Sequence, residues 1–257
     1  MTEYKKKPQV GLFVTCLVDL FRPTVGFASI KLMEDAGCDV HVPKAQTCCG
    51  QPAYNSGDHA DTRDIAEQVI SIFEGFDFIV APSGSCAGML KKHYPELFAG
   101  DAKWEARATA FSAKVYELVS FLTDVMFISN VDAKLNGSVT YHDSCSGLRE
   151  LNIQSQPRKL LGAVEGLTIK EMKDSDVCCG FGGTFCIKYS DISDSIVTKK
   201  ITNIDATGAD MLLAGDMGCL MNMAGKLRRQ GSQVEVRHVA EVLAGMTDAK
   251  PIAGNKI

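Results

Sequence analysis

The chain has 257 residues, which is enough for one large domain or for two domains of about 125 residues each. Hydrophobic residues make up 46% and charged residues 23%, the composition of an ordinary globular protein. The formal net charge of -4 gives no electrostatic reason to expect nucleic-acid binding, and no apolar run reaches the roughly 18 residues of a membrane-spanning helix. Residues 1–9 lack the apolar core of a secretory signal, so we expect a cytoplasmic protein.

The first half of the sequence alternates between predicted strands and helices. Strands are expected where short apolar runs rich in β-branched residues occur, and helices where apolar residues recur at helical spacing. The expected strands cover residues 10–14, 39–42 and 76–81, and the expected helices cover residues 23–36 and 58–73. A proline near the first turn and a glycine after the last turn support the first of these helices.

Residues 99–136 are expected to be helical and to pack between or beside the two halves. The dipeptide Asn136-Gly137 is a turn motif and marks a boundary. The second half then repeats the order of the first, with strands expected at residues 139–142, 167–170, 211–214 and 234–237. Helices are expected at residues 157–161, 192–204, 219–229 and 238–244.

Strands that alternate with helices favour parallel βαβ units. The sequence therefore predicts an α/β fold of two similar lobes, each a small, mainly parallel sheet flanked by helices, related by internal duplication. The predicted domains are residues 1–98 and 137–257, joined by a helical connection over residues 99–136.

Eight of the ten cysteines follow the same order in both halves. Each half carries a leading cysteine, a cysteine pair followed by glycine, and a last cysteine. The gap from the leading cysteine to the pair is 32 and then 33 residues, and the gap from the pair to the last cysteine is 37 and then 40 residues. The first set is Cys16, Cys48, Cys49 and Cys86, and the second set is Cys145, Cys178, Cys179 and Cys219. Because every position follows an expected strand, each set is predicted to form one site at one edge of its lobe.

Metal binding is the use of these cysteines that the pattern favours. Cytoplasmic cysteines stay reduced, and a disulfide between adjacent cysteines would close a strained ring. Clustered thiolates hold iron–sulfur clusters or zinc. Zinc ligands usually come in pairs separated by two to four residues, and the sequence has no such cysteine pair. An iron–sulfur cluster is therefore the leading prediction, and a structural module held together by zinc is the alternative.

The duplicated pattern resembles the cysteine-rich CCG domain, which occurs twice in the cysteine-rich component of heterodisulfide reductase and in the iron–sulfur subunit of glycolate oxidase. The runs CCGQPAYNSG from Cys48, YHDSC from Tyr141 and CCGFGGTF from Cys178 are similar to a third branch of the family, the lactate utilization proteins. The resemblance extends over about residues 9–245.

The resemblance implies an oxidoreductase subunit for electron transfer. It implies one or two iron–sulfur clusters per chain, of the [4Fe–4S] type, in a cytoplasmic complex that oxidises L-lactate to pyruvate. It also implies two partner subunits, at least one of them ferredoxin-like. A heterodisulfide-reductase-like or glycolate-oxidase subunit remains an alternative, and the sequence identifies no catalytic residue.

The sequence departs from the fuller family motif at its last element, Cys-x-x-Cys. The first position of that element is Ser83 in one half and Asp216 in the other, which leaves four thiolates per site, enough for a [4Fe–4S] cluster. Asp216 is a candidate oxygen ligand, with helix capping as the alternative. Cys186 is a candidate fifth thiolate for the second site, or else a free thiol. His142 is a candidate hydrogen-bond partner of cluster sulfur, or else an ordinary residue at a strand end.

Overall fold

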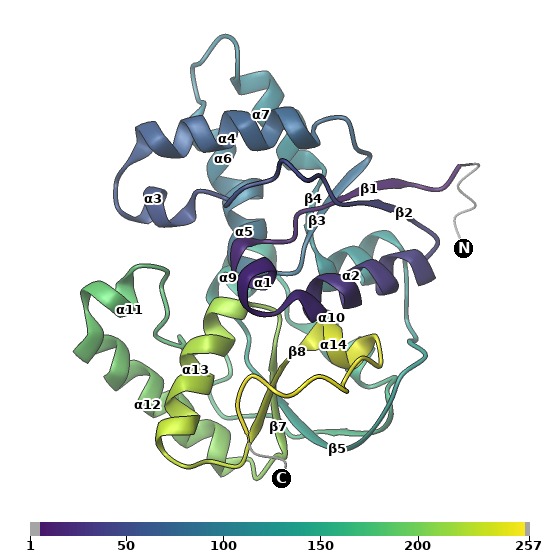
Figure 1. Ribbon diagram of the computed structural model, residues 1–257, viewed down its shortest axis with the longest axis vertical. Coiled ribbons are helices and arrows are strands. Elements are labelled where there is room, and N and C mark those ends of the chain that lie inside the picture. The colour runs from purple at the N-terminus through teal and green to yellow at the C-terminus, as the bar shows by residue number, and fades with distance from the viewer. Residues whose placement is uncertain (1–5, 255–257) are drawn as a thin grey trace.

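The computed structural model describes residues 6–254 and contains two four-stranded sheets in which every strand pair is parallel (Figure 1). The first sheet has the strand order β2-β1-β3-β4. Its strands are β1 (Gln9–Leu12), β2 (Asp39–His41), β3 (Phe78–Ala81) and β4 (Val115–Glu117). The second sheet has the order β6-β5-β7-β8. Its strands are β5 (Lys134–Tyr141), β6 (Glu165–Ile169), β7 (Met211–Ala214) and β8 (Glu235–His238).

Helices connect the strands of both sheets. In the first lobe they are α1 (Cys16–Phe21), α2 (Pro23–Asp35), α3 (Gln51–Asn55), α4 (His59–Phe73), α5 (Gly84–Gly88), α6 (Tyr94–Leu97), α7 (Glu105–Ala113), α8 (Leu118–Ser120) and the π-helical turns η1 (Met89–His93) and η2 (Phe121–Val125). In the second lobe they are α9 (Cys145–Leu151), α10 (Ser155–Leu161), α11 (Phe185–Lys188), α12 (Ser190–Ala206), α13 (Met217–Arg229) and α14 (Val239–Leu243).

The predicted fold class is confirmed. The two strand orders correspond position by position. In each sheet the first strand in sequence lies between the second and the third, and the fourth lies at the edge beside the third. Local sequence explains the long helices: Pro23 opens α2, and Asp58 caps α4 by accepting a hydrogen bond from the backbone N–H of Asp61.

One expectation from the sequence was wrong in part. The connection over residues 99–136, expected to be helical, contains strand β4, which pairs in parallel with β3 and completes the first sheet. The helices α7 and α8 flank this strand. Tertiary pairing decides the conformation of so short a segment, because three residues carry too little periodicity to predict a strand. The domain boundaries at residues 98 and 137 stay a prediction, and the chain ends at 1–5 and 255–257 lie outside the described residues.

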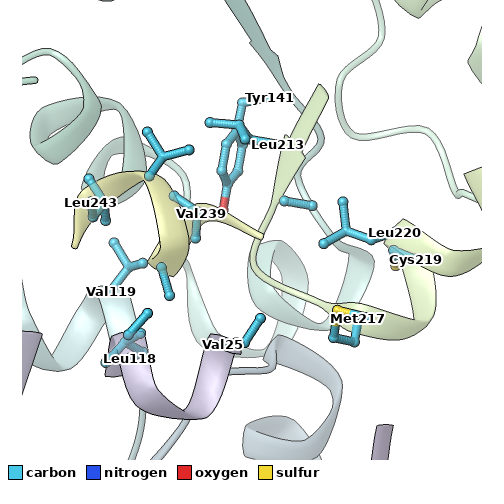
Figure 2. Packing of buried hydrophobic residues seen from close by; sticks show 14 of the residues in the cluster. Val25, Leu118, Val119, Tyr141, Leu213, Met217, Cys219, Leu220, Val239 and Leu243 are labelled. Atoms are coloured by element: carbon cyan, nitrogen blue, oxygen red, sulfur yellow. The ribbon is translucent and has the colours of Figure 1, made fainter. Parts of the chain in front are cut away.

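One large hydrophobic cluster extends across both lobes. The larger cluster of buried apolar residues joins Val25 and Leu118 of the first lobe to Leu213 and Val239 of the second (Figure 2). A second cluster lies under α4 and α7 and contains Phe73 and residues of β3. Burial of one continuous apolar surface therefore fixes the lobes against each other.

A buried ion pair crosses between the lobes. The Arg22 Nε atom lies 2.8 Å from the Glu241 Oε1 atom, and the side chain of Glu241 is fully buried. The Thr24 hydroxyl donates to the same oxygen at 2.5 Å. No helix among residues 6–254 is long and apolar enough to cross a membrane.

Candidate metal centres

The leading cysteine of each set opens the helix that follows the first strand of its sheet. Cys16 is the first residue of α1, and Cys145 is the first residue of α9. Ser144 caps α9 by accepting a hydrogen bond from the Gly147 N–H. The free backbone N–H groups in a first helical turn favour negative charge, so this position suits a thiolate.

The cysteine pairs lie in loops after the second strands, and the glycine after each pair shapes the loop. Gly50 and Gly180 both have a φ of 82°, in the left-handed region that favours glycine. The Gly180 N–H donates to the Cys178 Sγ atom at 3.3 Å, and the Gly50 N–H donates in the same way to Cys48. Both turns therefore direct a backbone donor at the first cysteine of the pair.

The last cysteine of each set lies in the first turn of the helix after the third strand. Ser83 caps α5 and accepts a hydrogen bond from the Cys86 N–H at 3.3 Å. Asp216 caps α13 and accepts from the N–H groups of Gly218 at 3.1 Å and Cys219 at 3.4 Å. All these cysteines lie beyond the carboxyl ends of parallel strands, where α/β sheets form their sites.

The structure brings the four thiols of the first set together. The Cys16 and Cys48 Sγ atoms lie 3.9 Å apart, and the Cys49 and Cys86 Sγ atoms lie 3.6 Å apart. A hydrogen bond between Cys48 and Cys49 joins the two pairs. The second set repeats this order of interactions, since the thiol of Cys178 interacts with those of Cys145 and Cys179, and the thiol of Cys179 also interacts with that of Cys219. None of these cysteines forms a disulfide.

One cysteine in each set has a strongly lowered pKa. Hydrogen bonds from the thiols of Cys16 and Cys49, together with backbone N–H groups, lower the pKa of Cys48 to about 2. Cys178 receives equivalent bonds, and its pKa is also lowered to about 2. Donating to Cys48, together with burial, raises the pKa of the Cys16 thiol above its ordinary value. Each set therefore contains one cysteine whose thiolate form is strongly favoured, and a bound metal would displace the protons of the thiols that donate to it.

A cavity of about 250 Å³ opens beside the first set. The thiols of the first set form one side of it, and residues of the second lobe form the other. Phe181, Ile187 and Met217 supply apolar surface there, and Asp216 also lines it. The first site therefore lies at the boundary between the lobes, and the loop after the second cysteine pair covers it.

Asp216 links the lobes as well as capping its own helix. Its Oδ2 atom accepts from the Ser83 hydroxyl at 3.1 Å and from the Ser85 N–H at 2.9 Å. Its Oδ1 atom accepts the two capping bonds within α13. Since both carboxylate oxygens have donors, the geometry supports helix capping over the candidate role as an oxygen ligand.

Two cysteines stand outside the duplicated sets. The Cys186 Sγ atom, in α11, donates to the Gly183 carbonyl at 3.4 Å, and neighbouring Thr184 and Ile187 line the cavity at the first site. The role of Cys186 as a fifth thiolate of the second site stays a prediction. Cys38 is buried in the core, its Sγ atom lies 3.9 Å from the Met126 Sδ atom, and burial raises its pKa to about 11.

The second site has a buried histidine and a buried lysine close to its cysteines. His142, at the end of β5, offers a ring nitrogen that lies within 4.8 Å of the Sγ atoms of Cys179 and Cys219. Burial, with the nearby charge of Lys200, lowers the pKa of His142 to about 4. Lys200 is itself buried, and its Nζ atom donates to the Asp174 carbonyl at 2.7 Å.

Sequence reasoning overlooked Lys200, although its position offered a clue. It lies between Val197 and Ile204 at helical spacing, on the buried face of α12. A lysine on an apolar helix face is almost always paired or functional. The same argument would have drawn attention to this residue before the structure was known.

The residues present fit an iron–sulfur cluster at each site. Soft thiolates converge from three separate loops, which is the donor set that such clusters require. Glycines and helix N-termini supply backbone N–H groups close to the sulfur atoms. At the second site, the two unpartnered ring nitrogens of buried His142 indicate a further donor.

Three comparisons bear on these centres. The cysteine-rich domain family, CCG, matches residues 10–91 and 139–224. Lactate utilization protein A of Macrococcus caseolyticus (strain JCSC5402) is 49% identical over 94% of this chain and 98% of its own length. The protein of the same name from Geobacillus sp. (strain WCH70) is 48% identical over 91% of this chain and 98% of its own length.

A solved structure also shares the fold. A hypothetical protein from Helicobacter pylori superposes with a TM-score of 0.62 at 11% identity, over 96% of this chain and 52% of the other. At that identity the likeness concerns the fold alone. The family match covers both cysteine sets, and the relatives match across nearly the whole chain. The chain therefore belongs to the duplicated cysteine-rich CCG domain family and, within it, to the family of lactate utilization protein A.

Proposed function

We propose that this chain is an iron–sulfur electron-transfer subunit of a cytoplasmic complex that oxidises L-lactate to pyruvate. The observation that carries the proposal is the convergence of four thiols in each lobe, in the same hydrogen-bonded order. The substrate follows from relatives at 48–49% identity that are named for lactate utilization.

The eight cysteines of the two sets would hold one cluster per lobe. When bound, an iron–sulfur cluster accepts and donates single electrons. The chain contributes thiolates at Cys48 and Cys178, whose low pKa keeps them ready to bind iron at neutral pH. The N–H groups of Gly50 and Gly180 and the first turns of α5 and α13 offset the negative charge of thiolate-bound iron.

Partner subunits would carry the chemistry on lactate itself. We expect two of them, at least one ferredoxin-like. Support comes from apolar side chains exposed around the first site: Leu20 and Phe21 on α1 are 70% and 60% exposed, and Ile187 on α11 is 80% exposed. Apolar surface next to a redox site suits contact with another protein. Purifying the tagged chain without oxygen from its own cells should co-purify two further proteins; a chain recovered alone would contradict this part of the proposal.

The cluster proposal is tested by metal analysis of protein purified without oxygen. We expect brown protein with iron and acid-labile sulfide in near-equal amounts. Cys49→Ala and Cys179→Ala should each lose about half of the iron, because each removes a central thiol of one set. Cys38→Ala is the matched control and should keep all of it, since Cys38 lies in the core outside both sets. Colourless, iron-free protein that still supports lactate oxidation would overturn the proposal.

A specific distance favours a second candidate function, a structural zinc module. Thiolates around one tetrahedral zinc ion, with bonds of about 2.3 Å, lie about 3.8 Å apart. The Sγ separations of 3.9 Å and 3.6 Å in the first set are close to that value. The same anaerobic metal analysis distinguishes the two candidates, because tightly bound zinc without sulfide would replace the cluster proposal.

A further inference from the structure

His142 is a buried residue whose hydrogen-bonding groups are left unsatisfied by the described residues around it. Its side chain is 1% exposed, and neither ring nitrogen has a hydrogen-bond partner among the described residues. Buried polar nitrogens without partners are rare in folded proteins, and each requires a physical explanation. The Sγ atoms of Cys179 and Cys219 are nearby atoms that could bind a metal. These two atoms and one ring nitrogen of His142 all lie within 4.8 Å of one another.

The corresponding position of the first lobe carries no ring nitrogen. Phe13 is the counterpart of His142, since each lies three residues before the leading cysteine. The backbone N–H groups confirm the correspondence: Phe13 donates to the Val80 carbonyl in β3 at 2.8 Å, and His142 donates to the Leu213 carbonyl in β7 at 2.9 Å. Phe13 is fully buried and packs against the ring of Phe73, with 5.7 Å between the ring centroids. The same position is therefore apolar in one lobe and nitrogen-bearing in the other.

Positive charge adds to this difference. Lys200 lies on the buried face of α12, where carbonyls of Asp174 and Ser175 accept from its Nζ atom at 2.7 Å and 3.1 Å. Its charge interacts with both Cys179 and His142. The corresponding helix of the first lobe, α4, buries only uncharged residues, namely Thr62, Ala66, Val69, Ile70 and Phe73.

We propose that the two metal sites are chemically unequal, with His142 binding iron through a ring nitrogen at the second site alongside Cys179 and Cys219, while the first site uses thiolates alone. The inference rests on the proposed function, because it assumes that iron occupies both sites. Three donors within 4.8 Å of one another need only small movements to bind one metal ion, whose bonds are about 2.0 to 2.3 Å long.

The difference in ligands between the two sites should give them different reduction potentials. A neutral imidazole ligand adds no negative charge, so an iron–sulfur centre with such a ligand has a higher reduction potential than a centre held with a thiolate in its place. The buried ammonium group of Lys200 acts in the same direction by stabilising the reduced, more negative state. An electron on a chain with both sites filled therefore resides at the second site, and the first site passes electrons to it.

The experiment uses holoprotein purified without oxygen and labelled with ¹⁵N-histidine. Pulsed electron paramagnetic resonance of the reduced wild-type protein should show strong coupling to a histidine nitrogen. This readout requires no variant, so it is independent of any folding defect. Absence of the coupling, in protein that contains iron at both sites, overturns the inference and leaves the proposed function intact.

Two reciprocal variants assign the signal. His142→Phe copies the first lobe and should abolish the nitrogen coupling and lower the potential of one centre only. Phe13→His leaves the second site untouched and should therefore keep the coupling and the potential that His142 gives to that site. An unchanged spectrum in His142→Phe contradicts the inference.

A separate test applies if metal analysis finds zinc in place of iron. If the protein holds zinc and no sulfide, the cluster proposal fails, and Co²⁺ then replaces zinc as the probe. Visible absorption of the Co²⁺ protein that shifts in His142→Phe but not in Phe13→His supports His142 as a ligand. Absorption that does not shift, or a protein that binds no metal, overturns the inference.

Discussion

Ser83 and Asp216 occupy the same position in the two halves of the chain and are hydrogen-bonded to each other, with 3.1 Å between the Ser83 Oγ and Asp216 Oδ2 atoms. Each also caps the helix that carries the last cysteine of its set. Around this contact α5 packs against α9, and α1 packs against α13, as Figure 1 shows at the centre of the molecule. The helices that begin at the two sites therefore meet in one place.

Asp216→Ala should damage both sites. The substitution removes the cap of α13 and both bonds to the first lobe, so we expect the free energy of unfolding to fall by about 2 to 4 kcal/mol. Iron content should decline at both sites. The helix that carries Cys219, α13, loses its cap, and the helix that carries Cys86, α5, loses its contact with the second lobe. Urea unfolding and iron analysis measure the two effects. Ser83→Ala should cost less, about 1 kcal/mol, and an equal or larger loss would argue against this account.

Gly180→Ala should disturb its site more than Gly50→Ala disturbs the other. Both glycines have a φ of 82°, so alanine costs about 1 kcal/mol of backbone strain at either position. At Gly180 an added Cβ atom would also lie 2.8 Å from the Ser193 carbonyl oxygen, whereas at Gly50 the nearest atom is 3.4 Å away. Unfolding free energy and iron retention of the two variants test this ranking. Equal losses would show that the Ser193 contact is unimportant.

Glu117 should make stability fall as the pH rises. Burial raises its pKa to about 8, while its ordinary value is 4.5. The folded state therefore binds a proton more tightly than the unfolded state, and the stabilisation present below about pH 4.5 is lost as the pH rises through 8. Each pKa unit corresponds to about 1.4 kcal/mol, so the effect reaches a few kcal/mol. Glu117→Gln should remove this dependence, while its amide oxygen can still accept from the Val119 N–H. Urea unfolding at pH 6 and pH 9 gives the comparison; identical pH slopes in both proteins would contradict it.

Glu241→Ala should lower the free energy of unfolding by about 3 to 5 kcal/mol. The substitution leaves the Arg22 guanidinium, only 12% exposed, without the carboxylate beside it. The exposed pair Lys31–Asp35 supplies the control, and Asp35→Ala should change stability by less than about 0.5 kcal/mol. Denaturant titration of the two variants tests the contrast. Comparable small losses would mean that the ion pair between the lobes contributes little.

Much of the architecture was predictable because the sequence repeats itself. The strands before Cys16, Cys48, Cys145 and Cys178 were expected near their observed positions, since short apolar runs precede those cysteines. Strand β4 was missed, although the repeat contained the clue. A fourth strand was expected at residues 234–237 in the second half, and its counterpart in the first half had to lie after the last cysteine helix. Periodicity within a three-residue segment could not reveal it.

The site was predictable in composition but not in its asymmetry. Spacing alone identified the two sets of cysteines, because strand ends of a parallel sheet meet at one edge. The contact between Ser83 and Asp216 joins residues 133 positions apart and depends on how the lobes pack. The electrostatic influence of Lys200 on His142 likewise depends on the approach of a helix and a strand. Local sequence patterns carry no information about such long-range geometry.

The core that passes from one lobe into the other changes what the duplication means for the molecule. A half expressed by itself would present the apolar face of Leu118 or of Val239 to water, and it would lose the partner that covers it. Each copy therefore depends on the other to cover part of its apolar surface, and we expect neither to fold stably when expressed alone.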